Sequence, residues 1–183
     1  MKQMLFVSII TAIANTFVAG SQPAPATEKS SSDFFAPYNF LVGNWTAEGG
    51  GGQPGTGTGS FTFKPDLGEK ILVRRNHADY PASKDRPASS HDDLLILYPD
   101  ASGASGKAVY FDNEGHVINY SVDVSSDKNM ITFVSEKLDG KPRFRLSYAK
   151  TGSDSVTIKF EMAPPGKPEG FTPYVTGNAR KSP

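Results

Sequence analysis

The chain has 183 residues, and its 19 basic side chains balance 19 acidic ones, so no net charge attracts it to nucleic acid or to an anionic membrane. This length suits one domain with a substantial core. The absence of cysteine excludes disulfides, thiolate metal sites and a cysteine nucleophile. Twelve phenylalanines and seven tyrosines, with 18 glycines and 14 prolines, favour short strands joined by turns.

The N-terminal segment has the pattern of a secretory signal peptide. After Lys2, residues 3–20 carry no charge, and the apolar stretch 4–14 is too short to span a membrane. Cleavage is expected after Gly20, with Ala26 as a second candidate, which places the mature protein in the periplasm or outside the cell. The predicted organisation is a signal peptide, a disordered Pro/Ala/Ser linker and a single domain, over residues 1–20, 21–32 and 33–183.

One short helical segment precedes a long series of strands. Pro37 suits the first helical position and Gly43 the residue after the end, so a helix of one or two turns is expected over 37–43. Ten runs of alternating or continuous apolar residues then follow, separated by Gly, Pro, Asp and Asn. The runs cover residues 44–48, 59–64, 70–79, 93–98, 108–112, 116–124, 130–136, 143–149, 156–162 and 172–179.

The spacing of these runs predicts an all-β fold. Most connections have hairpin length, which favours an antiparallel up-and-down β-barrel of about ten strands, closed by the short N-terminal helix. Because ten strands enclose more space than side chains easily fill, we expect an apolar pocket of about 300–1,000 Å³. Alternation predicts its lining as Ile118, Tyr120, Val122, Phe133, Phe144, Leu146, Tyr148, Ile158 and Phe160.

The start of the first strand resembles known barrel families. Gly43-Asn44-Trp45, directly after the helical segment, resembles the start of lipocalins and other calycin-type barrels, and residues 43–49 resemble the glycine-rich signature of nitrobindin-type haem barrels. The resemblance implies structural roles for Gly43 and Trp45, and it implies that Arg180, at the end of the last strand, packs over Trp45.

From residue 35 to residue 181 the chain resembles secreted bacterial calycin-like proteins of unknown function, which share the start of the first strand and a hairpin that corresponds here to 110–116. In nitrobindin-type barrels the proximal histidine lies near the C-terminus. No histidine follows His116 in this chain. No cofactor is therefore predicted, and haem binding is kept as an alternative.

Two adjacent arginines supply a candidate for an inward charge. Arg74 and Arg75 must face opposite sides of their strand. If Leu72 faces the core, so does Arg74, and a buried arginine needs a partner such as Asp92, Asp93 or a ligand carboxylate. The opposite phase, with Arg75 inside, stays open.

Three other features are explained without a ligand. His77, His91 and His116 show no metal-ligand spacing on a helix or hairpin, so we expect them at the surface or the rim. Residues 112–115 lack the spacing of a calcium loop and are expected to form a hairpin turn. The glycine-rich run 49–59 has no following lysine or helix that would make it a phosphate-binding loop.

We therefore expect an exported lipocalin-like barrel that binds a small apolar or amphipathic molecule. Two alternatives are a small barrel enzyme, an isomerase or hydrolase using His, Tyr and Arg, and a haem or metal binder of nitrobindin type. The chain is expected to be a monomer or a homodimer, and the ligand's identity is left open. The predicted ligand-binding residues are Arg74, His116, Tyr120, Phe133, Phe144, Tyr148 and Phe160.

Overall fold

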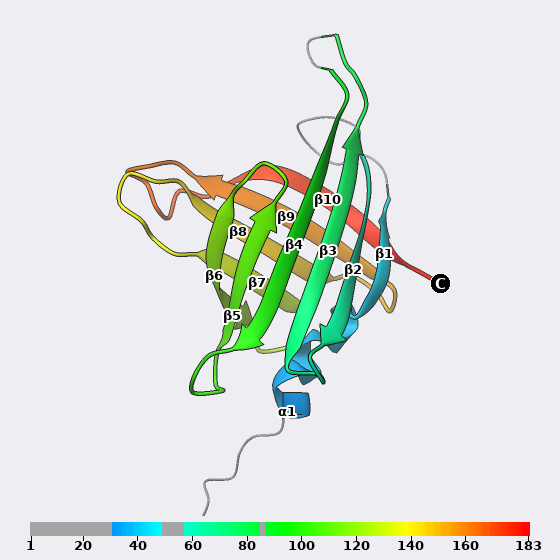
Figure 1. The fold of residues 1–183 in the computed structure, drawn as a ribbon, viewed down its shortest axis with the longest axis vertical. Coiled ribbons are helices and arrows are strands. Elements are labelled where there is room, and N and C mark those ends of the chain that lie inside the picture. The colour runs from blue at the N-terminus through cyan, green and yellow to red at the C-terminus, as the bar shows by residue number, and fades with distance from the viewer. Residues whose placement is uncertain (1–30, 49–56, 85–86) are drawn as a thin grey trace, which may run out of the picture.

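The computed structural model describes residues 31–48, 57–84 and 87–183. Ten antiparallel strands form a closed barrel in which each strand pairs with its neighbours in sequence and the first pairs with the last (Figure 1). The prediction of an all-β up-and-down barrel is confirmed. The strands are β1 (Gly43–Ala47), β2 (Thr58–Asp66), β3 (Ile71–Tyr80), β4 (Ser89–Pro99), β5 (Gly106–Asp112), β6 (Val117–Val124), β7 (Met130–Ser135), β8 (Arg143–Lys150), β9 (Ser155–Ala163) and β10 (Thr172–Ser182).

The predicted signal peptide lies outside the described residues, as does most of the predicted linker. Among the residues that the structure covers, no helix is long and apolar enough to cross a membrane.

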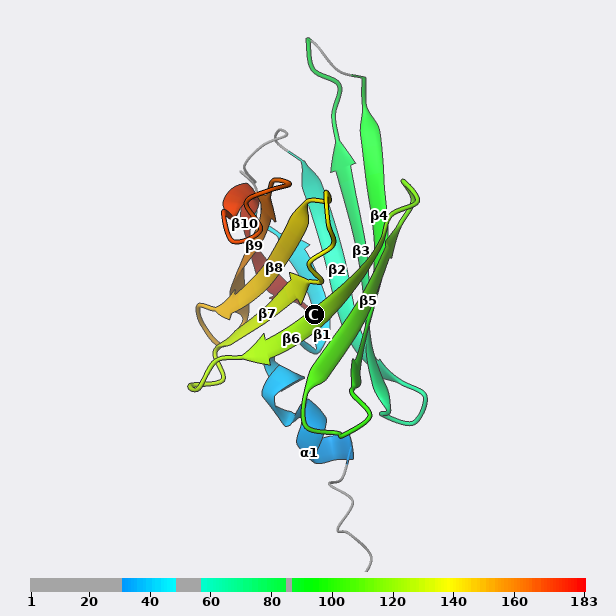
Figure 2. The ribbon, with the colours of Figure 1, turned by 90° about the vertical axis from the view of Figure 1, so that its left-hand side faces the viewer.

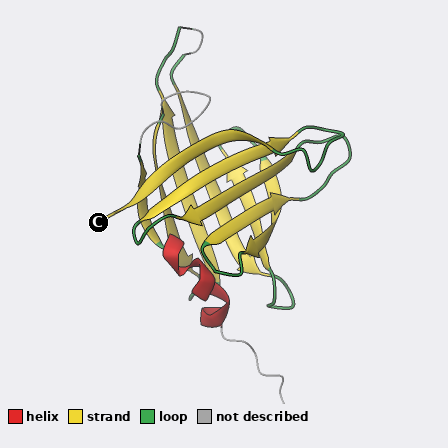
Figure 3. Ribbon diagram, turned by 180° about the vertical axis from the view of Figure 1, so that it is seen from behind, coloured by secondary structure: helices red, strands yellow, loops and turns green. Residues whose placement is uncertain are grey.

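A helical segment lies at one end of the barrel (Figures 2 and 3). It consists of α1 (Ser31–Phe35) and the 3-10 helix η1 (Ala36–Leu41), and so begins six residues before the predicted start at Pro37. The extra turn forms because Phe34 and Phe35 pack against the core, beyond the reach of the local Pro37 signal. We call this end the closed half of the barrel, and the end with the β3–β4, β5–β6, β7–β8 and β9–β10 connections the open half.

The two halves are filled differently. In the closed half, inward side chains such as Phe63, Leu97, Ile131 and Val156 are fully buried. All nine predicted lining residues belong to the core cluster or pack against it, which confirms the alternation. However, the ring of Tyr148 lies 5.7 Å from that of Phe61, 5.4 Å from Phe63 and 6.3 Å from Phe133. Aromatic rings therefore occupy the middle of the barrel, where the sequence predicted open space.

Trp45 joins the helical segment to the first strand. Its Nε1–H donates to the Leu41 carbonyl oxygen at 2.8 Å, and its ring stacks on Phe61 at 5.7 Å. The cation over the indole is Lys181, whose Nζ is 5.4 Å from the ring centroid. The expectation that Arg180 packs there is wrong, because Arg180 faces outward and its Nε donates to Glu48 at 2.6 Å.

Gly43 adopts a φ of 132°, and a Cβ there would lie 3.0 Å from Lys181 Cε. Only glycine combines this backbone conformation with the close approach of the lysine chain. The structural role expected for Gly43 therefore has a local physical cause.

Candidate functional site

A buried ion pair between β3 and β4 is the centre of the candidate site. The inward phase of β3 carries Arg74, which is 6% exposed, while Arg75 is exposed on the outer face. Arg74 Nη2 donates to Asp93 Oδ2 at 3.0 Å. Of the partners that the sequence allowed, Asp93 on the inner face of β4 is the one used, and Asp92 faces outward.

The strand register adds a second donor to this carboxylate. Asn76 follows Arg74 on the inner face of β3 and lies directly opposite Asp93 on β4. Its Nδ2 donates to the same Oδ2 at 2.9 Å. A short alternation of Leu72, Arg74 and Asn76 on one strand thus delivers two nitrogen donors to one acidic side chain.

His91 extends the network toward the open end. Its Nε2 lies 3.4 Å from Asp93 Oδ2 and 3.0 Å from the Tyr110 hydroxyl, and its Nδ1 lies 3.1 Å from Glu114 Oε1. The hydrogen bond to Asp93 raises the pKa of His91 to about 9, against the effect of burial, and Glu114 adds to the rise. The ring is therefore protonated at neutral pH and donates from both nitrogens.

Tyr110 and Asp112 complete the chain of contacts on β5. The Tyr110 hydroxyl donates to Asp112 Oδ2 at 3.3 Å, and burial raises the pKa of Tyr110. His116 Nδ1 lies 2.8 Å from the same oxygen, while the His116 ring is exposed at the β5–β6 turn. We call Arg74, Asn76, Asp93, His91, Tyr110 and Asp112 the polar wall.

Asp112, Glu114 and His116 form a possible metal-ligand group, since their ligand atoms lie within 4.8 Å of one another. Both oxygens of Asp112 are already used. Oδ1 accepts from the backbone N–H groups of Glu114 and His116, and Oδ2 accepts from Tyr110 and His116. The hydrogen bonds of a hairpin turn account for this group, as the sequence predicted for residues 112–115.

Two of the three histidines have polar partners on both ring nitrogens. His77 lies between Asp92 and Asp79, with its ring nitrogens 2.7 and 3.1 Å from their oxygens. Like His91, it has polar partners on both nitrogens. Neither ring therefore offers a free nitrogen for proton abstraction, which gives the enzyme alternative no support at these two residues.

An apolar wall faces the polar wall across the open half. Strands β8–β10 lie on the opposite side of the ten-strand closure from β3–β5. The rings of Phe144 and Phe160 stack at 5.8 Å, and Phe160 contacts the Tyr174 ring at 6.2 Å. Phe144 and Phe160 are only half-buried, Met162 is 38% exposed and Tyr174 is 48% exposed. We call these four residues the apolar wall.

Two tyrosines lie beneath the polar wall. The Arg74 guanidinium carbon is 5.9 Å from the Tyr148 ring centroid, and the Tyr120 ring contacts that of Tyr110 at 6.5 Å. Burial raises the pKa of Tyr148 to about 12, so its hydroxyl stays protonated at neutral pH.

The predicted ligand-binding residues are therefore distributed over three places. Arg74, Tyr120, Phe133 and Tyr148 meet in the interior, and Phe144 and Phe160 lie on the apolar wall. His116 joins the network through Asp112 and also lies 4.0 Å from Glu114. Sequence reasoning did not identify Asn76, His91 and Tyr110 as site residues. Their side chains face inward, but their strands carry apolar residues on both faces, so alternation alone does not show which face is the inner one.

Two polar atoms of the central ion pair have no hydrogen-bond partner among the described residues. They are Arg74 Nε and Asp93 Oδ1, and both are buried. Buried polar atoms are almost always paired, because an unpaired one costs about 1–3 kcal/mol. Such atoms indicate a place where a further polar group can be bound.

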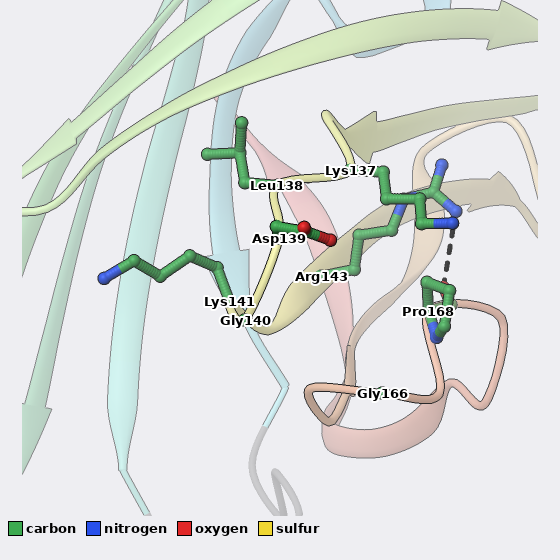
Figure 4. Close-up of a pocket in the computed structure, with 8 residues that line it drawn as sticks. All are labelled: Lys137, Leu138, Asp139, Gly140, Lys141, Arg143, Gly166 and Pro168. Carbon is green, nitrogen blue, oxygen red and sulfur yellow. Dashed lines mark hydrogen bonds between the residues drawn. The ribbon is translucent and has the colours of Figure 1, made fainter.

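Hollows at the surface lie at the rim of the barrel. One of about 200 Å³ lies between the β7–β8 and β9–β10 connections, where Arg143 Nη1 donates to the Pro168 carbonyl at 3.3 Å (Figure 4). Lys141 points away from it (Figure 4). A second, of about 560 Å³, lies at the base of the β3–β4 hairpin beside Tyr80. Neither is lined by the polar or the apolar wall.

The β9–β10 connection is held against the outside of the barrel. Arg145 makes two hydrogen bonds to Glu161, at 2.6 and 2.9 Å, and the Phe171 ring lies 4.3 Å above the Arg145 guanidinium. This contact places Phe171 of the connection against the outer face of β8.

Comparison with known proteins supports the fold alone. No protein-family model matches the chain, and no curated protein matches it. Among solved structures, the chain is similar to the crystal structure of Rv2717c from M. tuberculosis, with a TM-score of 0.55 and 14% identity. The match covers 85% of this chain and 99% of that one. At this identity the likeness shows a shared barrel architecture.

Proposed function

We propose that the protein is a calycin-like binding module that holds a small amphipathic molecule in the open half of its barrel. The apolar part of the ligand packs against Phe144, Phe160 and Tyr174. The polar end lies toward the polar wall on β3–β5. The proposal replaces the wide apolar pocket expected from the sequence by a shallower site above the packed rings.

The observation that carries this proposal is the difference in burial between the two halves. Most inward side chains of the closed half, such as Phe63 and Leu97, are fully buried, whereas Phe144, Phe160, Ile118 and His91 point inward and remain half-buried. Partly exposed aromatic rings that face a group of convergent polar atoms are typical of small-molecule sites. Burying one such ring against a ligand contributes about 1–2 kcal/mol.

Binding is tested by titration with N-phenyl-1-naphthylamine, a neutral probe that fluoresces in apolar surroundings. We expect saturable binding by the wild-type protein. Phe160→Ala should weaken it about tenfold, because the variant loses apolar contact area. Phe111→Ala is the matched control, since Phe111 is 38% exposed on the outer face of β5. Absence of saturable binding, or equal weakening by both variants, would contradict the proposal.

We also propose that the protein acts outside the cytoplasm. The support is the uncharged segment 3–20 followed by Pro/Ala/Ser sequence. N-terminal sequencing of the protein from a periplasmic fraction should show a chain that starts near Ser21. A chain that retains Met1 in the cytoplasmic fraction would contradict this.

A further inference from the structure

One hydrogen bond joins the two side chains of the central ion pair, and each side chain has a further polar atom beside that bond. Arg74 Nη2 bonds Asp93 Oδ2 at 3.0 Å, while the neighbouring donor, Arg74 Nε, and the neighbouring acceptor, Asp93 Oδ1, have no partner among the described residues. Each atom belongs to a side chain that is more than nine-tenths buried. One donor and one acceptor are thus unsatisfied within a single pair.

We propose that the ligand's head group is neutral and both accepts and donates hydrogen bonds, as an alcohol or an amide does; this rests on the proposed function. Such a group accepts from Arg74 Nε and donates to Asp93 Oδ1. A carboxylate cannot donate at neutral pH, and an ammonium ion cannot accept. A hydroxyl or an amide satisfies both atoms at once.

The charges around the pair support the same class of ligand. Arg74 is paired with Asp93, and His91 lies 3.1 Å from Glu114. His116 lies 2.8 Å from Asp112. Each of these three basic groups thus has its own carboxylate partner, so none of them is left with an unpaired positive charge to bind an acidic ligand. A ligand carboxylate would lie beside Asp93, where two like charges repel. The sequence-based expectation that Arg74 holds a ligand carboxylate therefore gives way to a neutral head group.

The head group reaches the pair from the open end. Asn76 and His91 are one inward position nearer that end than Arg74 and Asp93, and both are partly exposed. Their side chains must move for a ligand to enter.

The test compares four ten-carbon molecules that differ only in their head groups. Decanol, decanamide, decanoate and decylammonium each compete with N-phenyl-1-naphthylamine for the wild-type protein at neutral pH. Decanol and decanamide should displace the probe at concentrations about tenfold lower than the two charged molecules. Equal or stronger displacement by decanoate or decylammonium would overturn the inference, as would a bound probe that decanol and decanamide leave in place. A probe that does not bind at all would instead remove the proposed function.

A variant reverses the expected preference. Asp93→Asn keeps the shape of the side chain but leaves the charge of Arg74 uncompensated, so decanoate should gain about tenfold relative to decanol. Asp123→Asn is the matched control, because Asp123 is an exposed acid on β6 whose loss changes the net charge equally. Unchanged selectivity in folded Asp93→Asn would overturn the inference. Should that variant fail to fold, the wild-type series decides alone.

Discussion

The Arg74–Asp93 pair makes a quantitative prediction about stability. With exposures of 6% and 8%, the two residues lose nearly all contact with water on folding. Replacing one member leaves a buried charge without its partner, which costs about 3–5 kcal/mol. Asp93→Leu and Arg74→Met should each lower the free energy of unfolding by that amount.

The double variant Arg74→Met/Asp93→Leu should recover most of the loss, because it removes both charges and keeps the side-chain volume. Replacing a buried ion pair by apolar residues of similar volume often leaves the free energy of unfolding unchanged or raises it. Here Asn76 and His91 also lose an acceptor, so we expect the double variant to lie within about 2 kcal/mol of wild type. Urea denaturation of the four proteins at neutral pH, followed by fluorescence, measures all four free energies. Additive losses in the double variant, or single losses below about 1 kcal/mol, would refute the assignment of a buried, coupled pair.

Three further predictions concern other parts of the barrel. Lys181→Ala should lower the free energy of unfolding by about 0.5–2 kcal/mol, because it removes the contact with the indole of Trp45. Arg180→Ala, on the outer face, should change it by about 0.5 kcal/mol or less. Thermal denaturation of both variants compares them, and a larger loss in Arg180→Ala would contradict the structure. Because the pKa of His91 is raised to about 9 from 6.5, its stabilising effect is complete below about pH 6.5 and disappears as the pH rises through about 9. Urea denaturation between pH 6 and pH 10 should therefore show a fall in stability that His91→Gln removes, and an identical slope in the variant would exclude this role. Gly106→Ala should cost about 1–3 kcal/mol, because its Cβ would lie 2.9 Å from the Tyr38 hydroxyl; an unchanged melting temperature would contradict this packing.

Alternation along the strands predicted the interior well. The nine residues assigned to it lie in the core cluster or against it, because in β6, β8 and β9 every second residue is apolar and most of the others are polar. Strand counting was a poorer guide to empty space. The estimate of a wide pocket ignored the volume of Trp45, Phe61, Phe63 and Tyr148, whose rings meet in the middle of the barrel.

The polar wall was hard to predict for two physical reasons. His91 belongs to β4, but the expected strand began at residue 93. The segment Ser89–Asp92 is polar, and it extends β4 by pairing with β3 in the long β3–β4 hairpin. Tyr110 lies between Val109 and Phe111, so the apolar pattern does not reveal its phase.

The last strand shows a related error. It continues to Ser182, past the expected end at residue 179. Its pairing with β9 shifts between Pro173 and Val175, after which Ala179 and Lys181 point inward. Arg180 therefore points outward, one position away from the residue that covers Trp45.

The central claim is that an amphipathic ligand lies between the apolar and the polar wall of the open half. NMR titration of the wild-type protein with decanol tests it most directly, with aromatic carbon and arginine Nε resonances observed together. We predict that the signals of Phe144, Phe160 and Arg74 Nε shift and saturate at the same decanol concentration, while the signals of Phe111 on the outer face stay in place. Shifts that are confined to Phe111 and other outward side chains, or signals that do not respond, would contradict the account.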